Sequence, residues 1–208
     1  MELTSLAISA AALVVSATTF WFTVLRRGTV KMTKPTQVGI GFGDNGKKNQ
    51  VFVRALMFAT SKRGAVLENM FARVRAGERS QTFSVWVYGE PKSMLRGAGL
   101  VVPETGIAAN FHFLLRPDEP DFQLAPATYK IEVFGRLLGQ TGEQLLSTSE
   151  IAVSSGLIGA AQDRVGLQFD WAPDTDAYVG HVAKRQMVID PKDVAEFIST
   201  FGTEPGRQ

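Results

Sequence analysis

The sequence predicts an all-β protein, an antiparallel sandwich preceded by one transmembrane helix and followed by a short C-terminal helix. Three features of the 208 residues indicate this class. The chain opens with a long apolar stretch, short alternating segments fill its middle, and an apolar stripe at helical spacing lies near the C-terminus. We expect an anchor at 1–27, a linker at 28–35, a sandwich at 36–153 and an extension at 154–208.

The anchor is predicted from length, composition and flanking charge. Residues 3–25 contain no charged side chain, and as a helix they are roughly 34 Å long, enough to span a hydrocarbon core of about 30 Å. Aromatic residues close the stretch, as in the belt at a membrane interface, and two arginines follow. The residues that define this predicted membrane anchor are Leu3, Phe20, Trp21, Phe22, Leu25, Arg26 and Arg27.

The order of the charges predicts the topology. A cleaved signal peptide carries its basic region before the apolar stretch, whereas here Arg26, Arg27, Lys31 and Lys34 follow it and only Glu2 precedes it. The stretch is therefore predicted to remain as an uncleaved single-pass anchor in the lipid bilayer. Because basic flanks stay on the cytoplasmic side, we expect the C-terminal domain in the cytoplasm.

Composition excludes several classes of protein. Hydrophobic residues at 45% and charged residues at 20% are typical of a folded chain. The absence of cysteine excludes disulfides, thiolate zinc sites and cysteine nucleophiles. Basic residues exceed acidic ones in 35–116 and acidic residues exceed basic ones in 117–208, so the folded part as a whole is not basic. We therefore expect no nucleic-acid partner.

About seven strands are predicted before residue 153, at 37–42, 50–60, 65–75, 81–88, 110–115, 129–134 and 144–153. Segment 50–60 is nearly continuous in apolar residues, as a strand buried on both faces would be. Segment 65–75 also fits helical spacing, but the strands around it favour a strand. Alternation in 81–88 places Phe83, Val85 and Val87 on one face and Trp86 and Tyr88 on the other. Segment 165–171 is a candidate for an additional strand, and 173–185 is predicted to be an irregular connection.

One stretch carries a fold-level resemblance. The sequence LAPATY at 124–129, followed by KIEVFG, resembles the turn into the penultimate strand of immunoglobulin-like and fibronectin-type sandwiches. The resemblance implies an immunoglobulin-like sandwich in which the Tyr129 hydroxyl returns to nearby backbone. The stretch departs from the usual pattern at Ala127, where glycine is common, and the chain lacks the paired cysteines of antibody domains. It implies a fold and no function.

The glycine-rich segment 41–47 has the spacing of a phosphate-binding loop. Such a loop needs serine or threonine next, to hold magnesium, and then a helix. Lys48 stands at that position and a strand-like segment follows, so we expect a β-hairpin and no bound nucleotide.

Other catalytic and metal-binding patterns are equally incomplete. The two histidines, His112 and His181, are too few for a zinc site, and Asp170, Asp174 and Asp176 lack the glycine and distal glutamate of a calcium-binding loop. No nucleophile elbow occurs. We predict no catalytic residue, no metal and no cofactor, and do not expect an enzyme.

Two groups of residues are candidate interaction sites. The first is a basic group of Arg73, Arg75 and Arg79, with Lys62 and Arg63 nearby, in which alternation places Arg73 and Arg75 on one strand face. This basic face is either a solvated surface or a contact with anionic lipid headgroups or an acidic partner. Near the C-terminus an apolar helical stripe follows Asp190-Pro191, a helix-start signal. The stripe consists of Val194, Phe197, Ile198 and Phe201. We expect it to dock on its own sandwich, with a protein partner as the alternative and the membrane surface as the least favoured one, because the segment carries more acidic than basic residues.

These features favour a membrane-tethered protein–protein interaction or assembly module at the cytoplasmic face, whose partner is another protein or a second copy of the chain. The alternative is a ligand-binding or hydrolytic domain with a pocket built from loops. A deep pocket lined with converging polar groups would favour the alternative, and a broad surface would favour the interaction module.

Overall fold

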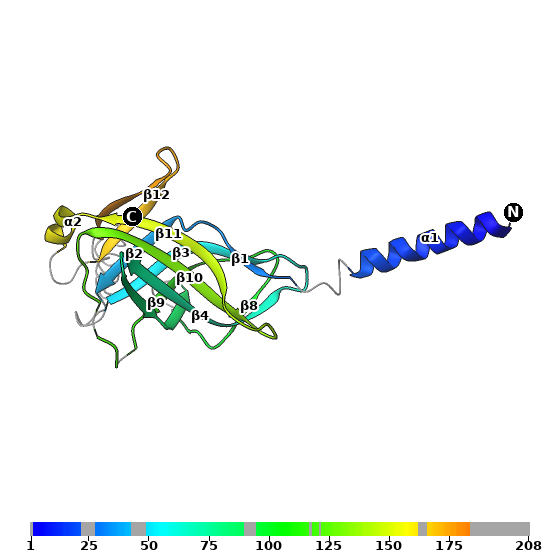
Figure 1. The fold of residues 1–208 in the computed structure, drawn as a ribbon, viewed down its shortest axis with the longest axis horizontal. Coiled ribbons are helices and arrows are strands. Elements are labelled where there is room, and N and C mark those ends of the chain that lie inside the picture. Colours follow the sequence, from blue (N-terminus) through cyan, green and yellow to red (C-terminus); the bar gives the residue numbers. More distant parts are fainter. Residues whose placement is uncertain are drawn as a thin grey trace, which may run out of the picture.

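An N-terminal helix and two antiparallel sheets make up the described part of the chain (Figure 1). The computed structural model describes residues 2–21, 28–42, 49–89, 95–116, 118–120, 122–161 and 166–183. The helix α1 (Glu2–Phe20) is long and apolar enough to cross a membrane, and no residue of Leu3–Phe20 is buried. Ser9 Oγ donates to the Ser5 carbonyl over 2.9 Å and Thr19 Oγ1 donates to the Val15 carbonyl over 2.8 Å. These bonds satisfy the hydroxyls without water, as an apolar environment requires.

The larger sheet, sheet A, has the strand order β13-β12-β2-β3-β9-β6-β7, and β1 also pairs with β3. Its strands are β1 (Val30–Met32), β2 (Gln37–Phe42), β3 (Asn49–Ala59), β6 (Val85–Gly89), β7 (Leu95–Arg96), β9 (Ile107–Leu114), β12 (Leu167–Ala172) and β13 (Ala177–Val182).

The smaller sheet, sheet B, has the order β11-β10-β4-β5, with β8 also on β4. Its strands are β4 (Ala65–Ala76), β5 (Arg79–Phe83), β8 (Leu100–Val102), β10 (Ala127–Leu137) and β11 (Gln144–Val153). The pairings of both sheets are antiparallel, which confirms the predicted antiparallel all-β class. The strands predicted at 37–42, 50–60, 65–75, 110–115, 129–134 and 144–153 are β2, β3, β4, β9, β10 and β11.

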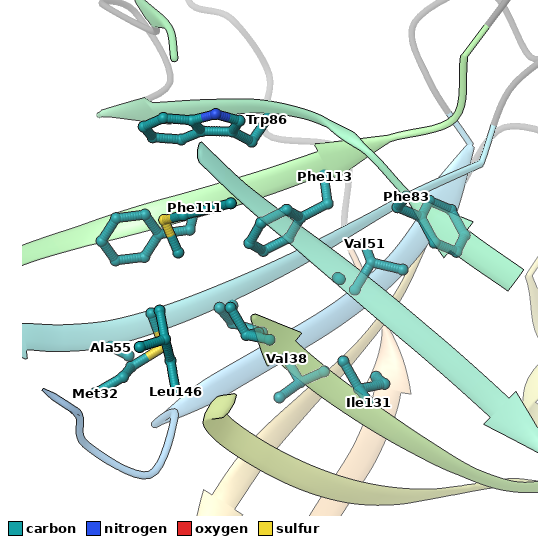
Figure 2. Close-up of a cluster of buried hydrophobic side chains, with 14 of the residues drawn as sticks. Met32, Val38, Val51, Ala55, Phe83, Trp86, Phe111, Phe113, Ile131 and Leu146 are labelled. Atoms are coloured by element: carbon teal, nitrogen blue, oxygen red, sulfur yellow. The ribbon is translucent and has the colours of Figure 1, made fainter. Parts of the chain in front are cut away.

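The core lies between the two sheets. Figure 2 shows its side chains, which include Val38, Val51, Phe111, Phe113 and Trp86 from sheet A and Phe83, Ile131 and Leu146 from sheet B. Along β3 the inward residues are buried, whereas Arg54 and Leu56 point outwards and are exposed. The prediction that this strand is buried on both faces is therefore wrong, because its outer face is partly open to solvent.

The segment predicted as one strand at 81–88 divides between the sheets. β5 belongs to sheet B and β6 to sheet A, with Ser84 between them. Phe83 and Trp86 are both buried, whereas Val85 and Val87 are only half-buried. The predicted grouping of Val85 with Val87 and of Trp86 with Tyr88 is confirmed, whereas the prediction that Phe83 shares a face with the two valines is wrong. Every second side chain faces the core only while a strand stays in one sheet. The chain passes from sheet B to sheet A at Ser84, so Phe83 and Trp86 both face the core although they are three positions apart.

The linker contributes to the core. β1 pairs with β3 through Val30 opposite Ala59 and Met32 opposite Met57, and both Val30 and Met32 are buried. The break between β1 and β2 stays bonded to β3, since the Thr33 amide donates to the Leu56 carbonyl and the Thr36 amide donates to the Arg54 carbonyl, each over 2.9 Å.

The Tyr129 hydroxyl makes the backbone contact that the resemblance implies. It accepts from the Ala125 amide over 2.9 Å and donates to the Ala125 carbonyl over 2.8 Å. The ring packs edge-to-face on Phe122 with centroids 5.8 Å apart, and Phe122 packs on Phe83 in the same way at 5.7 Å. The predicted corner contact of Tyr129 is confirmed, and it ties the start of β10 to the core.

Beyond residue 153 the chain forms a short helix and a hairpin. The helix α2 (Ser155–Ala160) is capped by Ser154, whose hydroxyl accepts from the Leu157 amide over 3.2 Å. β12 then adds to β2, and β13 adds to β12. The prediction of an irregular connection at 173–185 is wrong over 177–182, because these residues form β13, an edge strand of sheet A in which exposed and half-buried side chains alternate.

The contacts of Tyr129 predict its contribution to stability. Tyr129→Phe removes the hydroxyl and leaves both backbone groups of Ala125 without their partner. We expect a loss of about 1–3 kcal/mol in the free energy of unfolding, since two hydrogen bonds are removed and the usual net value of each is about 0.5–1.5 kcal/mol. Denaturant midpoints of the two proteins measure this difference, and equal midpoints would contradict the structural role of the corner.

The pairing of β1 predicts where a soluble fragment should begin. A fragment of residues 28–208 retains Val30 and Met32, whereas a fragment of 36–208 loses both. Burying such a side chain is worth about 1.5–3 kcal/mol, so the shorter fragment should be less stable by about 3–6 kcal/mol. Thermal unfolding followed by circular dichroism measures the difference. Equal melting temperatures would mean that β1 adds nothing to the core.

Candidate functional site

A groove lies between β11, at the edge of sheet B, and the β12–β13 hairpin. Its volume is about 460 Å³, and it is bordered on one side by residues 148–152 of β11 and on the other by Trp171, Asp176 and Tyr178. Thr128 of β10 and Lys34, from the break between β1 and β2, also line the groove. Asp176 lies in the hairpin turn with φ of 49°, in the left-handed region that aspartate tolerates better than bulky residues.

The hairpin wall of the groove holds a cation. Lys34 Nζ lies 3.0 Å from the centroid of the Trp171 ring and 3.5 Å from Asp176 Oδ1. Trp171 packs edge-to-face on Tyr178 with centroids 5.0 Å apart. An ammonium group over a ring face is attracted by the ring quadrupole, and a nearby carboxylate adds to that attraction. This wall is therefore suited to a lysine or arginine side chain.

The Tyr178 hydroxyl ties three segments together beneath this wall. It donates to the Pro35 carbonyl over 2.7 Å, so its other bond, of 3.1 Å, is donated by Ser149 Oγ. Burial raises the pKa of the Tyr178 phenol, while the bond from Ser149 acts in the opposite direction. The phenol therefore stays neutral at physiological pH. Its two bonds hold the β13 wall, β11 and the break after β1 at a set separation.

The opposite wall is a free sheet edge. β11 is the last strand of sheet B, and none of the described strands pairs with its outer side. Near its start, Gln144 Nε2 donates to the Val30 carbonyl over 2.7 Å, so that end of the edge is covered by β1. The residues 148–152 lie along the groove instead. An edge strand presents unpaired N–H and C=O groups, with which an extended peptide can form backbone hydrogen bonds.

The outer face of sheet A carries a polar ladder. Asp170, Gln37, Arg54 and Asn110 are neighbours across β12, β2, β3 and β9. Gln37 Nε2 donates to Asp170 Oδ1 over 2.9 Å, and Arg54 Nη1 donates to Asn110 Oδ1 over 3.4 Å. Because these side chains form hydrogen bonds with one another, we interpret the ladder as a structural network on the sheet face.

His112 lies one step along the same face and is buried. Its ring stacks on Phe52 with centroids 5.3 Å apart, and neither ring nitrogen has a hydrogen-bond partner among the described residues. Burial lowers the pKa of the His112 imidazole, so the ring is held neutral. The neutral ring therefore packs on the outer face of sheet A as a flat, weakly polar side chain.

His181 and Asp170 form the contact that most resembles hydrolytic machinery. Their Nδ1 and Oδ2 atoms are 3.6 Å apart, and both side chains are about half exposed. Hydrolysis by such a pair needs a nucleophile bonded to the imidazole, and no serine or threonine in the described ranges makes that bond. Within those ranges no group of three or more metal-ligating side chains is present either.

Two of the three predicted arginines contact neighbouring side chains, and the third is exposed. Arg75 Nε lies 3.3 Å from Glu132 Oε2, and the Arg73 guanidinium lies 4.8 Å from the centroid of the Phe134 ring. Both arginines lie on the outer face of sheet B, whereas Arg79 is exposed at the first position of β5. The structure thus brings Arg73 and Arg75 together, and their contact with a partner stays a prediction.

The remaining predicted residues belong to the two ends of the chain. Leu3 and Phe20 lie in α1, and Trp21 follows it, all three exposed. Phe22, Leu25, Arg26 and Arg27 lie outside the described residues, as do Val194, Phe197, Ile198 and Phe201 of the predicted C-terminal helix.

Sequence reasoning missed the groove. Its main residues, Lys34, Trp171 and Tyr178, were assigned to a linker, a candidate strand and an irregular connection. The one signal in the sequence was the run WAPDTDAY at 171–178, in which Pro and Asp form a tight turn between two aromatic residues. The approach of Lys34 to this hairpin depends on a fold contact that no local pattern carries.

Comparison with known proteins adds no assignment. No protein-family model, curated protein or solved structure matches the chain.

Burial of His112 predicts a pH dependence. The unfolded imidazole has a pKa of about 6.5 and the folded one a lower value, so below that pH the unfolded state binds more protons. The contribution to stability is complete above about pH 6.5 and is lost as the pH falls towards the folded value. We expect His112→Leu to lose less stability than the wild type between about pH 7.5 and pH 5.5.

Urea midpoints at the two pH values measure that difference. The variant should have the circular dichroism spectrum of the wild type at the higher pH, which serves as the control for folding. Identical losses in the two proteins would contradict a neutral, buried imidazole.

Proposed function

We propose that the chain is a single-pass membrane protein whose β-sandwich is a docking module for another protein, held at the cytoplasmic face. The apolar helix α1 supports the anchor. The basic residues after it support the orientation, because such flanks are retained in the cytoplasm. The observation that carries the docking role is the groove, in which a free sheet edge faces a pair of packed aromatic side chains.

Three properties of the groove support a protein segment as its occupant. The free edge of β11 offers backbone hydrogen bonds to an extended chain, whatever its sequence. Trp171 and Tyr178 belong to the residue types that dominate binding energy at interfaces. The two carboxylates that line the groove, Glu150 and Asp176, outnumber its one ammonium group, Lys34, and this excess of negative charge favours a basic residue in the bound segment.

We also infer that the sandwich is immunoglobulin-like. Lettering β2, β3, β4, β5, β6, β9, β10 and β11 in chain order as A, B, C, C′, D, E, F and G gives the sheets A-B-E-D and G-F-C-C′. Immunoglobulin-like domains have the sheets A-B-E-D and C-F-G, with a corner tyrosine near the start of strand F. Tyr129 at the start of β10 supports the same assignment. This inference concerns the fold alone, and the docking proposal rests on the groove.

Site-specific photo-crosslinking in the full-length, membrane-inserted protein tests the docking role. A photoreactive residue replaces Thr148 or Thr128, which border the groove, or Ser80, which is exposed on the opposite edge strand β5. We expect protein adducts from the groove positions and none from Ser80. An adduct of twice the chain mass would identify a second copy as the partner, and another mass would identify a different protein.

Two substitutions then test the chemistry of the groove. Trp171→Ala and Glu150→Lys should each reduce the adduct formed from Thr148, since one removes the aromatic surface and the other repels a basic segment. Trp171→Phe retains a ring and should retain more of the adduct. Adducts that form equally at Ser80, or that are unchanged in both variants, would contradict the proposal.

A further inference from the structure

The end of the sandwich where the chain enters from α1 has a surface of its own. Thr29 is bonded to the turn after β3, since its amide donates to Thr60 Oγ1 over 2.9 Å and the Thr60 amide donates to its carbonyl over 2.9 Å. Gly28 is pressed against the same turn, because a Cβ added there would lie 2.6 Å from Ser61 Oγ. Gly28 and Thr29 are the first described residues after the anchor segment. The turn 60–64, which contacts both of them, is therefore held close to the point where the chain leaves the anchor.

Apolar side chains are exposed beside this turn. Val101 and Leu138 are 67% and 61% exposed, and Val66 is 38% exposed. The three are neighbours, since Val66 is paired with Val101 across β4 and β8 and the Leu138 amide donates to the Val66 carbonyl over 2.9 Å. They border a shallow cleft of about 260 Å³ that Gly28, Ser61 and Arg63 also line. Figure 1 shows β8 and β1 at the end of the sandwich nearest α1.

The charges around this apolar patch are mostly positive. Lys62 and Arg63 are exposed in the turn, and Lys31 is exposed on β1. Two exposed carboxylates lie on this side, Glu104 in the turn after β8 and Glu68, two residues from Val66 along β4. In the sequence, Arg26 and Arg27 directly precede Gly28. Basic groups around exposed apolar side chains match the chemistry of an anionic leaflet, in which phosphates lie above the acyl boundary.

The tether keeps this surface near the bilayer. Residues 22–27 separate Trp21, the last described residue of the anchor segment, from Gly28. Even fully extended, the chain between these two residues spans at most about 25 Å. The nearby leaflet is thus present at a high effective concentration, and each contact needs little intrinsic affinity.

We propose that this end of the sandwich is a second membrane contact. Val66, Val101 and Leu138 enter the boundary between headgroups and acyl chains of an anionic leaflet, and Lys62 and Arg63 lie among the phosphates. The proposal rests on the proposed membrane anchoring and adds a fixed orientation of the domain. The groove beside β11 lies on another part of the sandwich and remains available to a protein partner.

Spin labels in the full-length protein test this contact, and the chain has no cysteine that would interfere. Val101→Cys and Leu138→Cys place a label in the patch, and Val179→Cys, at a valine that is 56% exposed on β13, is the matched control. In vesicles of phosphatidylcholine and phosphatidylglycerol we expect the patch labels to become more accessible to oxygen than to an aqueous nickel complex. The Val179 label should remain accessible to the nickel complex. In addition, Lys62→Glu should return the Val101 label towards the aqueous value.

Extraction at alkaline pH separates the two claims. If the protein stays with the vesicles while the patch labels remain aqueous, the second contact is overturned and the anchoring stands. If the protein is released, the anchoring on which both claims rest is overturned. Spin–spin broadening at Val101 that disappears on dilution in lipid would show that a second copy covers the patch, which also overturns the lipid contact.

Discussion

Burial of two apolar sheet faces against each other is the constraint on which the rest of this structure depends. Phe83 faces the core from sheet B and Trp86 faces it from sheet A, so the chain changes sheets between them at Ser84. Without that crossing, one of these two large aromatic side chains would point to solvent. The outer faces are left to hydrogen-bonded pairs, such as Gln37 with Asp170, and to ion pairs, such as Arg75 with Glu132. They are also left to rings that stack, such as Phe52 on His112.

The groove follows from an extension of sheet A that sheet B does not match. The β12–β13 hairpin adds to β2 and projects beside β11, whose outer edge is then left facing the hairpin instead of a paired strand. Tyr178 bridges the two through Ser149 and also holds the Pro35 carbonyl. The break between β1 and β2 therefore has a second role, because it delivers Lys34 to the Trp171 ring.

The two proposed contacts divide the surface by chemistry. The end beside Thr29 combines exposed aliphatic side chains with lysine and arginine, which suits a lipid boundary with anionic headgroups. The groove combines aromatic rings, carboxylates and a free backbone edge, which suits an extended basic segment of protein. A domain oriented by its tethered end presents the groove in a restricted set of directions, which would lower the entropic cost of docking.

Features that depend on local pattern could be predicted from the order of residues. The length, composition and flanking charges of the apolar stretch predict a spanning helix, and alternation with turn residues predicted most of the longer strands. Both signals are carried by neighbouring residues. The corner contact of Tyr129 could also be predicted from local sequence, since its hydroxyl bonds a residue four positions earlier. The tertiary structure alone decided the change of sheet at Ser84, the pairing of Val30 and Met32 with β3, and the hairpin at 177–182. It also decided the meeting of Lys34 with Trp171, because these contacts join segments that are distant in the chain and whose local patterns are compatible with several partners.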